Sequence, residues 1–218
     1  MIPPLRNGVG EHSFLPLPHI RKVERMRKVV LLLGSMVAAM LLVSGVALAD
    51  HLANTVQCTT DPFTDCVGTE ENDHMYGTDE RELIYALGGD DQIDAYGHFD
   101  HVDGGPGNDT LYGGSGSDNL LGASENDRLY GGTEVDSLYG QQNDDFLHGG
   151  GSGDLLEGNM GKDQLQGGDG ADDIVTGNDT VVDTVDCGSG NDVVWFHKGI
   201  DKINSNCEKK RPFSENPY

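Results

Sequence analysis

The sequence predicts an all-β fold, a two-sided solenoid of parallel strands with two nine-residue repeats in each coil. Three observations predict it: a nine-residue repeat that runs without insertion through residues 68–175, the abundance of glycine (32 of 218 residues), and an aromatic content of only 6%. A chain with so few large apolar side chains does not build an ordinary globular core. A short repeat can instead bury its apolar positions by stacking one unit on the next.

Twelve blocks of nine residues make up the repeat, and three positions of the block are nearly constant. Position 6 is Asp in eleven blocks, with Glu82 as the exception, position 1 is Gly in ten, and position 8 is aliphatic or Met in all twelve. The apolar residue predicts a three-residue strand with one inward side chain. The glycine-rich remainder predicts a turn, and excludes a helix. Two strands and two turns give one coil, and the coils stack as parallel sheets of a β-roll.

Stacking brings every second turn into register, so the position-6 acids form two ladders. The first edge carries Asp73, Asp91, Asp109, Asp127, Asp145 and Asp163, and the second edge carries Glu82, Asp100, Asp118, Asp136, Asp154 and Asp172. Carboxylates about 5 Å apart repel by about 3 kcal/mol per pair at an effective dielectric constant of 20. A hard cation between successive turns would convert this repulsion into ligation, and carboxylates with turn carbonyls form an all-oxygen site that suits calcium. The alternative is that Asp only caps solvated turns, which would not require the same position in every block.

The blocks resemble the glycine-rich calcium-binding nonapeptides of the RTX (hemolysin-type) family, in particular its small secreted bacterial forms. The family pattern is G-G-x-G-x-D-x-U-x, and GGPGNDTLY, GGSGSDNLL and GGDGADDIV match it at every specified position. The resemblance implies a parallel β-roll that holds several Ca²⁺ ions, each between a turn and the second turn after it. The ligands that it implies are Asp side chains and turn carbonyls, at Asp91, Asp100, Asp109, Asp118, Asp127, Asp136, Asp145, Asp154, Asp163, Asp172, Gly105, Gly107, Gly114, Gly116, Gly168 and Gly170.

Other blocks depart from this pattern. Glycine occupies position 2 in only five of the twelve blocks, and position 4 in five. We therefore expect some weak or empty sites, with the best ones between the turns that begin at Gly113 and Gly131 and between those that begin at Gly149 and Gly167.

The first 49 residues predict an export signal. A basic stretch precedes an apolar run at residues 29–49, which closes on Ala-Leu-Ala with small residues at the −3 and −1 positions of a signal-peptidase site. We expect residues 1–25 to be an upstream extension, residues 26–49 to be the signal peptide, and the mature protein to be secreted. An uncleaved anchor is the alternative, because 21 apolar residues can just span a bilayer. Typical RTX proteins use a C-terminal signal instead, so we expect a different export route for this chain.

All four cysteines follow the export signal, at Cys58, Cys66, Cys187 and Cys207. An even number in an exported chain indicates two disulfides. Three pairings are possible, and we favour Cys58–Cys66 with Cys187–Cys207 because each bond would staple one end of the repeat.

The ends of a stacked roll need caps. We expect a cap loop at residues 50–67, the roll at 68–175, and a degenerate final coil with a C-terminal cap at 176–207. Trp195, Phe196 and Ile203 would cover that last coil, and residues 208–218 would form a flexible tail.

The charge distribution excludes several functions. Six of the 14 basic and two of the 37 acidic residues lie in the first 49 positions, so the rest of the chain carries eight basic and 35 acidic residues. Such a surface repels nucleic acids and anionic lipids. Acid/base catalysis needs one carboxylate pair that differs from the others, whereas these carboxylates form uniform ladders. The sequence therefore predicts a binding protein and not an enzyme.

The favoured function is that of a secreted, monomeric calcium-binding protein that folds on export. One alternative is a cell-surface adhesin or extracellular-matrix module that displays Tyr112, Tyr130 and Tyr139 to a glycan or to another cell. A third hypothesis is a polysaccharide-acting enzyme.

Overall fold

A computed structural model describes residues 54–59 and 65–213 of the chain. This part forms 18 β-strands, arranged as two sheets of nine strands, and contains no α-helix. Accordingly, no helix among the described residues could cross a membrane. The predicted export signal lies outside the described residues.

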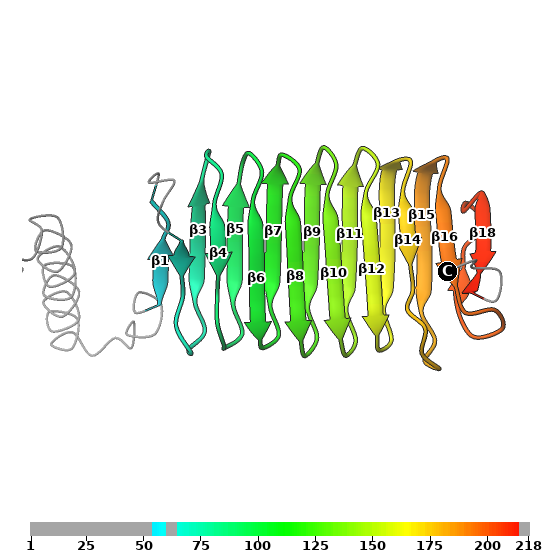
Figure 1. Cartoon of the computed structure of the whole chain (residues 1–218), viewed down its shortest axis with the longest axis horizontal. Helices are drawn as coiled ribbons and strands as arrows, with labels where there is room; N and C mark the ends of the chain where they lie inside the picture. Colours follow the sequence, from blue (N-terminus) through cyan, green and yellow to red (C-terminus); the bar gives the residue numbers. More distant parts are fainter. Residues whose placement is uncertain (1–53, 60–64, 214–218) are drawn as a thin grey trace, which may run out of the picture. The chain divides into compact units, whose positions relative to one another are not determined.

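The odd-numbered strands form sheet A and the even-numbered strands form sheet B (Figure 1). Sheet A consists of β1 (Thr55–Gln57), β3 (His74–Thr78), β5 (Gln92–Tyr96), β7 (Thr110–Ser115), β9 (Arg128–Thr133), β11 (Phe146–Gly151), β13 (Gln164–Gly170), β15 (Thr184–Gly190) and β17 (Lys202–Ile203). Sheet B consists of β2 (Cys66–Val67), β4 (Leu83–Tyr85), β6 (His101–Pro106), β8 (Asn119–Ser124), β10 (Ser137–Gln142), β12 (Leu155–Met160), β14 (Asp173–Val175), β16 (Val193–Phe196) and β18 (Lys209–Pro212).

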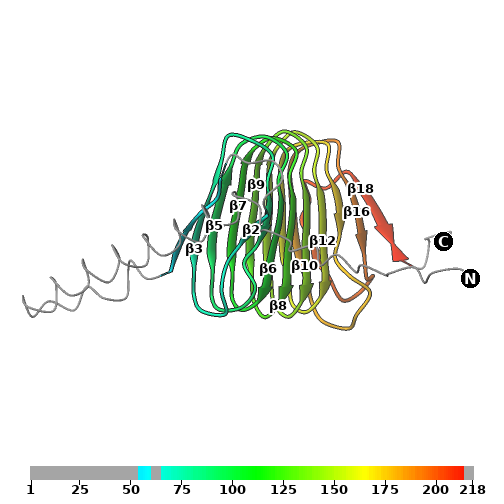
Figure 2. The same cartoon turned by 60° about the vertical axis from the view of Figure 1, so that its left-hand side comes forward.

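The chain alternates between the two sheets, which face each other with turns along both edges (Figure 2). All pairings between the described strands are parallel. Leu111 pairs with Leu129 in sheet A and Leu138 with Leu156 in sheet B, so each residue lies opposite its equivalent two blocks further along. This register confirms the predicted two-sided solenoid with two nine-residue blocks in each coil.

The central strands are longer than the three residues that the sequence predicted. β7, for example, spans six residues, from position 7 of one block to position 3 of the next. Its second half remains paired, because Gly114 lies opposite Gly132 in β9. The glycine-rich positions thus belong partly to the sheet, where the backbone alone supplies the pairing groups.

The core between the sheets is one apolar side chain thick. The inward residue of each block is fully buried: Met75, Ile84, Ile93, Val102, Leu111, Leu120, Leu129, Leu138, Leu147, Leu156, Leu165 and Ile174. Two residues further along most of these strands the inward position is Gly, as the burial of Gly113 and Gly131 shows. Because glycine has no side chain, the space beside it is available to the carboxylates of the turns.

A two-residue insertion follows the twelfth block. The step between paired residues lengthens by the same amount, so that Leu165 pairs with Val185 and Ile174 pairs with Val194. The insertion lies in the turn before Asp183, and both sheets continue beyond it without a break in strand order. The repeat therefore extends past residue 175, into the region where the sequence predicted a degenerate final coil.

Both predicted disulfides are present, Cys58–Cys66 at one end and Cys187–Cys207 at the other. Phe196 and Ile203 pack against the core as expected. Trp195 differs from expectation, because it lies on the outer face, where the guanidinium of Arg211 sits 5.1 Å from its ring.

The expectation of a flexible tail from residue 208 is wrong for residues 209–212. These residues form β18, which pairs with β16 as the last strand of sheet B. A parallel ladder uses backbone groups, so a polar sequence such as Lys209 to Arg211 can extend it.

Candidate metal centre

Each position-6 carboxylate belongs to the last residue of a turn, directly before a strand, and is buried along one of the two edges of the roll. Turns of the first edge lead from sheet B to sheet A, and turns of the second edge lead from sheet A to sheet B. Asp136 illustrates the arrangement: its Oδ1 accepts the backbone N–H of Asp118 (2.8 Å), and its own N–H donates to Oδ1 of Asp154 (2.9 Å). Each carboxylate thus links its coil to the coil before it.

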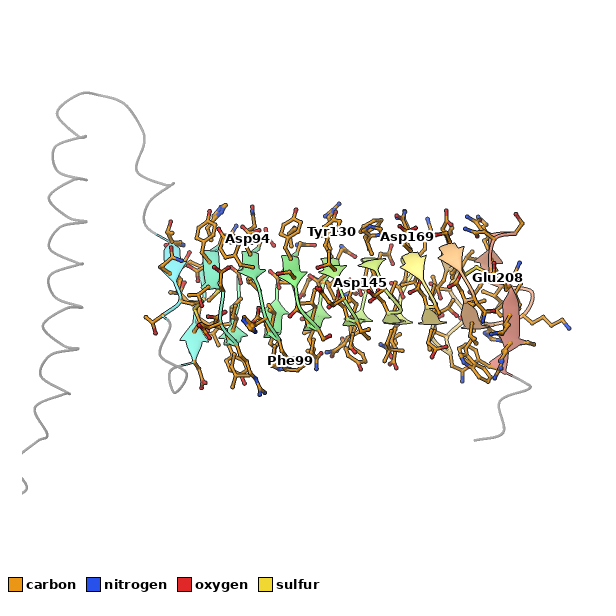
Figure 3. All side chains as sticks on the ribbon, turned by 90° about the horizontal axis from the view of Figure 1, so that it is seen from above. Asp94, Phe99, Tyr130, Asp145, Asp169 and Glu208 are labelled. Carbon is orange, nitrogen blue, oxygen red and sulfur yellow. A yellow bond between two sulfur atoms is a disulfide. The ribbon has the colours of Figure 1, made fainter. Side chains whose placement is uncertain are left out.

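The same bond recurs along both edges, at 2.7–3.0 Å, from Asp73 to Asp183 and from Glu82 to Asp192. All ten predicted Asp ligands belong to these ladders and are at most 3% exposed. Figure 3 shows Asp145 between the two sheets, whereas Asp94 and Tyr130 point away from the outer face of sheet A.

The second carboxylate oxygen has no partner. In each of the ten predicted ligands Oδ2 is buried and accepts no hydrogen bond. In eight of the ten turns position-1 glycine leaves the space for it: a Cβ on Gly131 would lie within 3.0 Å of Oδ2 of Asp136, and the same holds for Gly122 and Asp127. Ala86 and Ala95 occupy position 1 in the turns of Asp91 and Asp100. In these glycine-containing turns the pairing of Gly at position 1 with Asp at position 6 therefore has a steric basis, and one carboxylate oxygen per turn is left without a partner.

Burial raises the pKa of these carboxyls. The pKa of Asp127, of Asp136 and of Asp145 rises to about 8, mainly because burial disfavours the charged form. The hydrogen bond from the backbone N–H of the equivalent Asp in the preceding coil lowers the pKa, whereas neighbouring carboxylates add to the increase. The pKa also rises to about 8 for Asp100, to about 7 for Asp91, Asp154 and Asp163, and to about 6 for Asp109, Asp118 and Asp172.

These features fit a hard cation. Unpartnered carboxylate oxygens are ligands that calcium prefers, together with backbone carbonyls. No group of three or more His, Cys, Asp or Glu side chains within the described ranges could hold a metal ion by itself. Turn carbonyls are the other oxygen donors in the ligand set that the sequence predicted.

The glycines that were predicted as carbonyl donors share one conformation. Gly105, Gly107, Gly114, Gly116, Gly168 and Gly170 all have positive φ, between 91° and 147°. At Gly114 a Cβ would also lie within 3.0 Å of the carbonyl of Tyr96 in the preceding coil. Turns that lack glycine adopt the same conformation with an L side chain, as at Ala123 (φ 83°), Gln141 (φ 79°) and Asn159 (φ 73°).

Hydrogen-bond donors terminate the ladders. At the start, Asp73 Oδ2 accepts the N–H (2.6 Å) and the hydroxyl (2.9 Å) of Thr69. Thr78 donates its N–H to Oε2 of Glu82 (3.2 Å) and its hydroxyl to Oε1. At the end of the first edge, Asp201 Oδ2 accepts the hydroxyl of Thr176 (2.8 Å) and the N–H of His197 (2.6 Å). The unpartnered oxygens therefore lie chiefly in the middle of each ladder.

The sequence reasoning missed three members of the ladders. Asp183 and Asp201 continue the first edge, and Glu208 accepts the N–H of Asp192 at the end of the second edge. The pKa of Asp183 rises to about 8, again mainly through burial. Aligning Val185 with Leu165, across a step two residues longer than the others, would have revealed Asp183.

The three tyrosines considered for glycan binding do not form one surface. Tyr112 and Tyr130 stack on the outer face of sheet A, with ring centroids 4.9 Å apart and planes inclined by 11°. Tyr139 belongs to β10 in sheet B, on the opposite side of the roll. The stacked pair and Tyr139 therefore lie on different faces of the roll.

A parallel solenoid with two ladders of buried carboxylates and carbonyl-rich turns defines a calcium-binding repeat protein. Four copies of the RTX calcium-binding nonapeptide repeat match the chain, at residues 67–97, 94–129, 121–156 and 148–182. These matches cover more than half of the chain, which therefore belongs to the RTX calcium-binding repeat family. No individual curated protein matches it.

Proposed function

We propose that the protein is exported and binds several Ca²⁺ ions between successive turns of its roll, and that this binding completes folding outside the cell. The observation that supports the proposal most strongly is the set of twelve buried Asp oxygens without a hydrogen-bond partner. A buried charge without a partner costs several kcal/mol. A thin core of one apolar residue per block offers little to offset that cost, so the calcium-free roll is destabilised by its own ligands.

The ligands in this proposal are the ten Asp residues of the two ladders and the carbonyls of the positive-φ turns, represented by Gly105, Gly114 and Gly168. Ions held by such turns bind at about 0.1–1 mM, the range of extracellular modules. Calcium supplies positive charge beside the unpartnered oxygens, and the protein supplies their alignment through the Asp-to-Asp hydrogen bonds.

Export is supported by the N-terminal signal pattern and by the two disulfides, since disulfides persist in oxidising compartments. Members of this repeat family are typically secreted. The low calcium concentration inside a cell would leave the chain extended until it is exported, after which the repeats would fold onto one another as a one-dimensional stack.

The proposed role is binding without catalysis. The ten predicted ligands share one setting, with Oδ1 bonded and Oδ2 unpartnered, and this uniformity suits ligation better than a division into acid and base. The RTX β-roll is a structural calcium-binding fold, which agrees with this role.

Isothermal titration of the full-length chain with calcium, and separately with magnesium, tests the binding proposal. We expect several calcium ions per chain and weak or no binding of magnesium, which demands a tighter octahedral site. Absence of calcium binding at 10 times the expected concentration, about 10 mM, would refute the proposal. Mass spectrometry of the protein in the culture medium tests export, for which the expected first residue is Asp50.

A further inference from the structure

The two edges of the roll are not built alike. On the first edge the residue before each ladder Asp forms a second ladder, the outer ladder, which consists of Asn72, Asp90, Asn108, Asn126, Asp144 and Lys162. In it, the side-chain oxygen of one residue accepts the backbone N–H of the corresponding residue in the next coil. Asp90 Oδ1, for instance, accepts both the N–H and the Nδ2 of Asn108, each at 2.9 Å. Six successive coils are thereby tied together without an ion.

The second edge does not have the residues for an outer ladder. The corresponding positions hold Phe99, Ser117, Val135, Gly153 and Ala171, and only Ser117 has a side-chain oxygen. This edge is instead rich in glycine. Position 2 of four successive turns is Gly114, Gly132, Gly150 and Gly168, each with positive φ. The first edge has Ala123, Gln141 and Asn159 at that position in three successive turns.

Oxygen atoms also converge closely in the four successive turns of the second edge that begin at Gly113, Gly131, Gly149 and Gly167. The position where Gly131 would carry a Cβ lies within 3.0 Å of Oδ2 of Asp136 and 2.6 Å from the carbonyl oxygen of Gly149 in the next coil. The corresponding carbonyl lies at 2.7 Å for Gly113 and for Gly149, and at 2.5 Å for Gly167. On the first edge, the three nearest atoms at the central glycines Gly104, Gly122 and Gly140 all belong to the Asp of the same turn, and a carbonyl oxygen of the next coil lies within 3.0 Å only at the outer turns, at Gly68 and Gly158.

We propose that the edges have different roles, with calcium filling the second edge first, between the turns of Asp118, Asp136, Asp154 and Asp172. The outer ladder keeps the first edge aligned before any ion binds, so the first edge is a calcium-independent spine with weaker sites. This inference rests on the proposed calcium binding, and it adds an order of filling and a structural element that needs no metal.

Paired isosteric variants of the full-length chain, with both disulfides intact, test the order of filling. The second-edge variant combines Asp136→Asn with Asp154→Asn, and its matched control combines Asp127→Asn with Asp145→Asn. The four residues are equally buried, at 0–2% exposure. Asn keeps the Oδ1 acceptor of the ladder and replaces only the unpartnered oxygen.

Calcium titration by calorimetry should show that the second-edge variant loses the tight class of sites, with half-saturation at about tenfold higher calcium or more. The first-edge control should stay within about twofold of the unmodified chain. Equal losses in both variants, or a larger loss in the control, would overturn the order of filling while leaving calcium binding intact. An unmodified chain that binds no calcium would instead refute the proposed function, and this inference with it.

A second measurement examines the outer ladder without calcium. In EGTA, Asn108→Ala combined with Asn126→Ala should lower the melting temperature by on the order of 5 °C, because two links between coils are lost. The control combines Ser117→Ala with Val135→Ala at the corresponding second-edge positions, and its melting temperature should equal that of the unmodified chain. Equal melting of both variants would overturn the assignment of the first edge as the spine.

Discussion

Replacing Gly131 by Ala should destabilise the roll far more than the same change at Gly151. A Cβ at position 131 would lie 2.6 Å from the carbonyl oxygen of Gly149 and would also overlap Oδ2 of Asp136. The carbonyl belongs to the backbone of the next coil and cannot turn aside, and the carboxylate is held by its ladder bond to Asp118. Overpacking of this kind costs about 3 kcal/mol.

Gly151 is a matched control because it is also a glycine of the repeat, at position 3 of a block, but a Cβ at this residue would meet open space. The nearest atom to its Cβ position is the carbonyl oxygen of Gly132, at 3.9 Å, and neither Gly131 nor Gly151 has positive φ. Gly151→Ala should therefore be neutral or should stabilise by about 0.5 kcal/mol through the unfolded chain.

Thermal unfolding followed by circular dichroism, in saturating calcium and again in EGTA, measures both variants. For a folded unit of this size, about 3 kcal/mol corresponds to a decrease in melting temperature on the order of 6–12 °C. If Gly131→Ala and Gly151→Ala melted at the same temperature, the steric pairing of position-1 glycine with position-6 aspartate would be refuted.

Three further predictions concern pH, backbone conformation and the disulfides. In EGTA the roll should be more stable near pH 5 than near pH 8. The pKa of Asp127 is raised from 3.8 to about 8, so between these pH values the folded chain retains protons that the unfolded chain releases. A urea midpoint that rises with pH in EGTA would contradict this. Ala123→Gly should stabilise by about 0.5–1 kcal/mol because it relieves a positive φ of 83°, whereas Ala171→Gly, at a residue without positive φ, should destabilise; urea unfolding of both variants decides. Replacing Cys187 and Cys207 by Ser should cost about 3 kcal/mol for the loss of a bond that closes 20 residues, and an unchanged urea midpoint would show that the cap holds without it.

The strand order, the register and the disulfides could be predicted because an uninterrupted nine-residue period permits few arrangements. Once Leu111 and Leu129 are assigned to the same sheet, every other inward residue follows from the period. The chain ends of the repeat then determine which cysteines can meet, and Cys187 and Cys207 are bonded as predicted.

Three other features could not be predicted, because the local sequence pointed away from them. The two-residue insertion before Asp183 disguised the continuation of the first edge, because a fixed step of nine no longer found it. The polar residues from Lys209 to Arg211 suggested a loose tail, although a parallel strand needs only its backbone to pair. The outer ladder was missed because position 5 looks variable until alternate blocks are compared, as Asn108 and Asn126 show.

The proposed filling order also explains why the repeats depart from the family pattern on one edge more than on the other. Where Ala123 and Gln141 replace glycine in the first-edge turns, hydrogen bonds between Asn or Asp side chains and the next coil accompany the change. Side-chain links of this kind allow the edge to retain its stacking with fewer glycines.

Far-UV circular dichroism of the full-length chain, with disulfides intact and titrated with calcium, tests the central claim most directly. We expect a calcium-dependent gain of β structure at about 0.1–1 mM, reversed by EGTA and not reproduced by magnesium. Full β structure in EGTA, unchanged by calcium, would contradict the claim that the unpartnered carboxylates make folding depend on the ion.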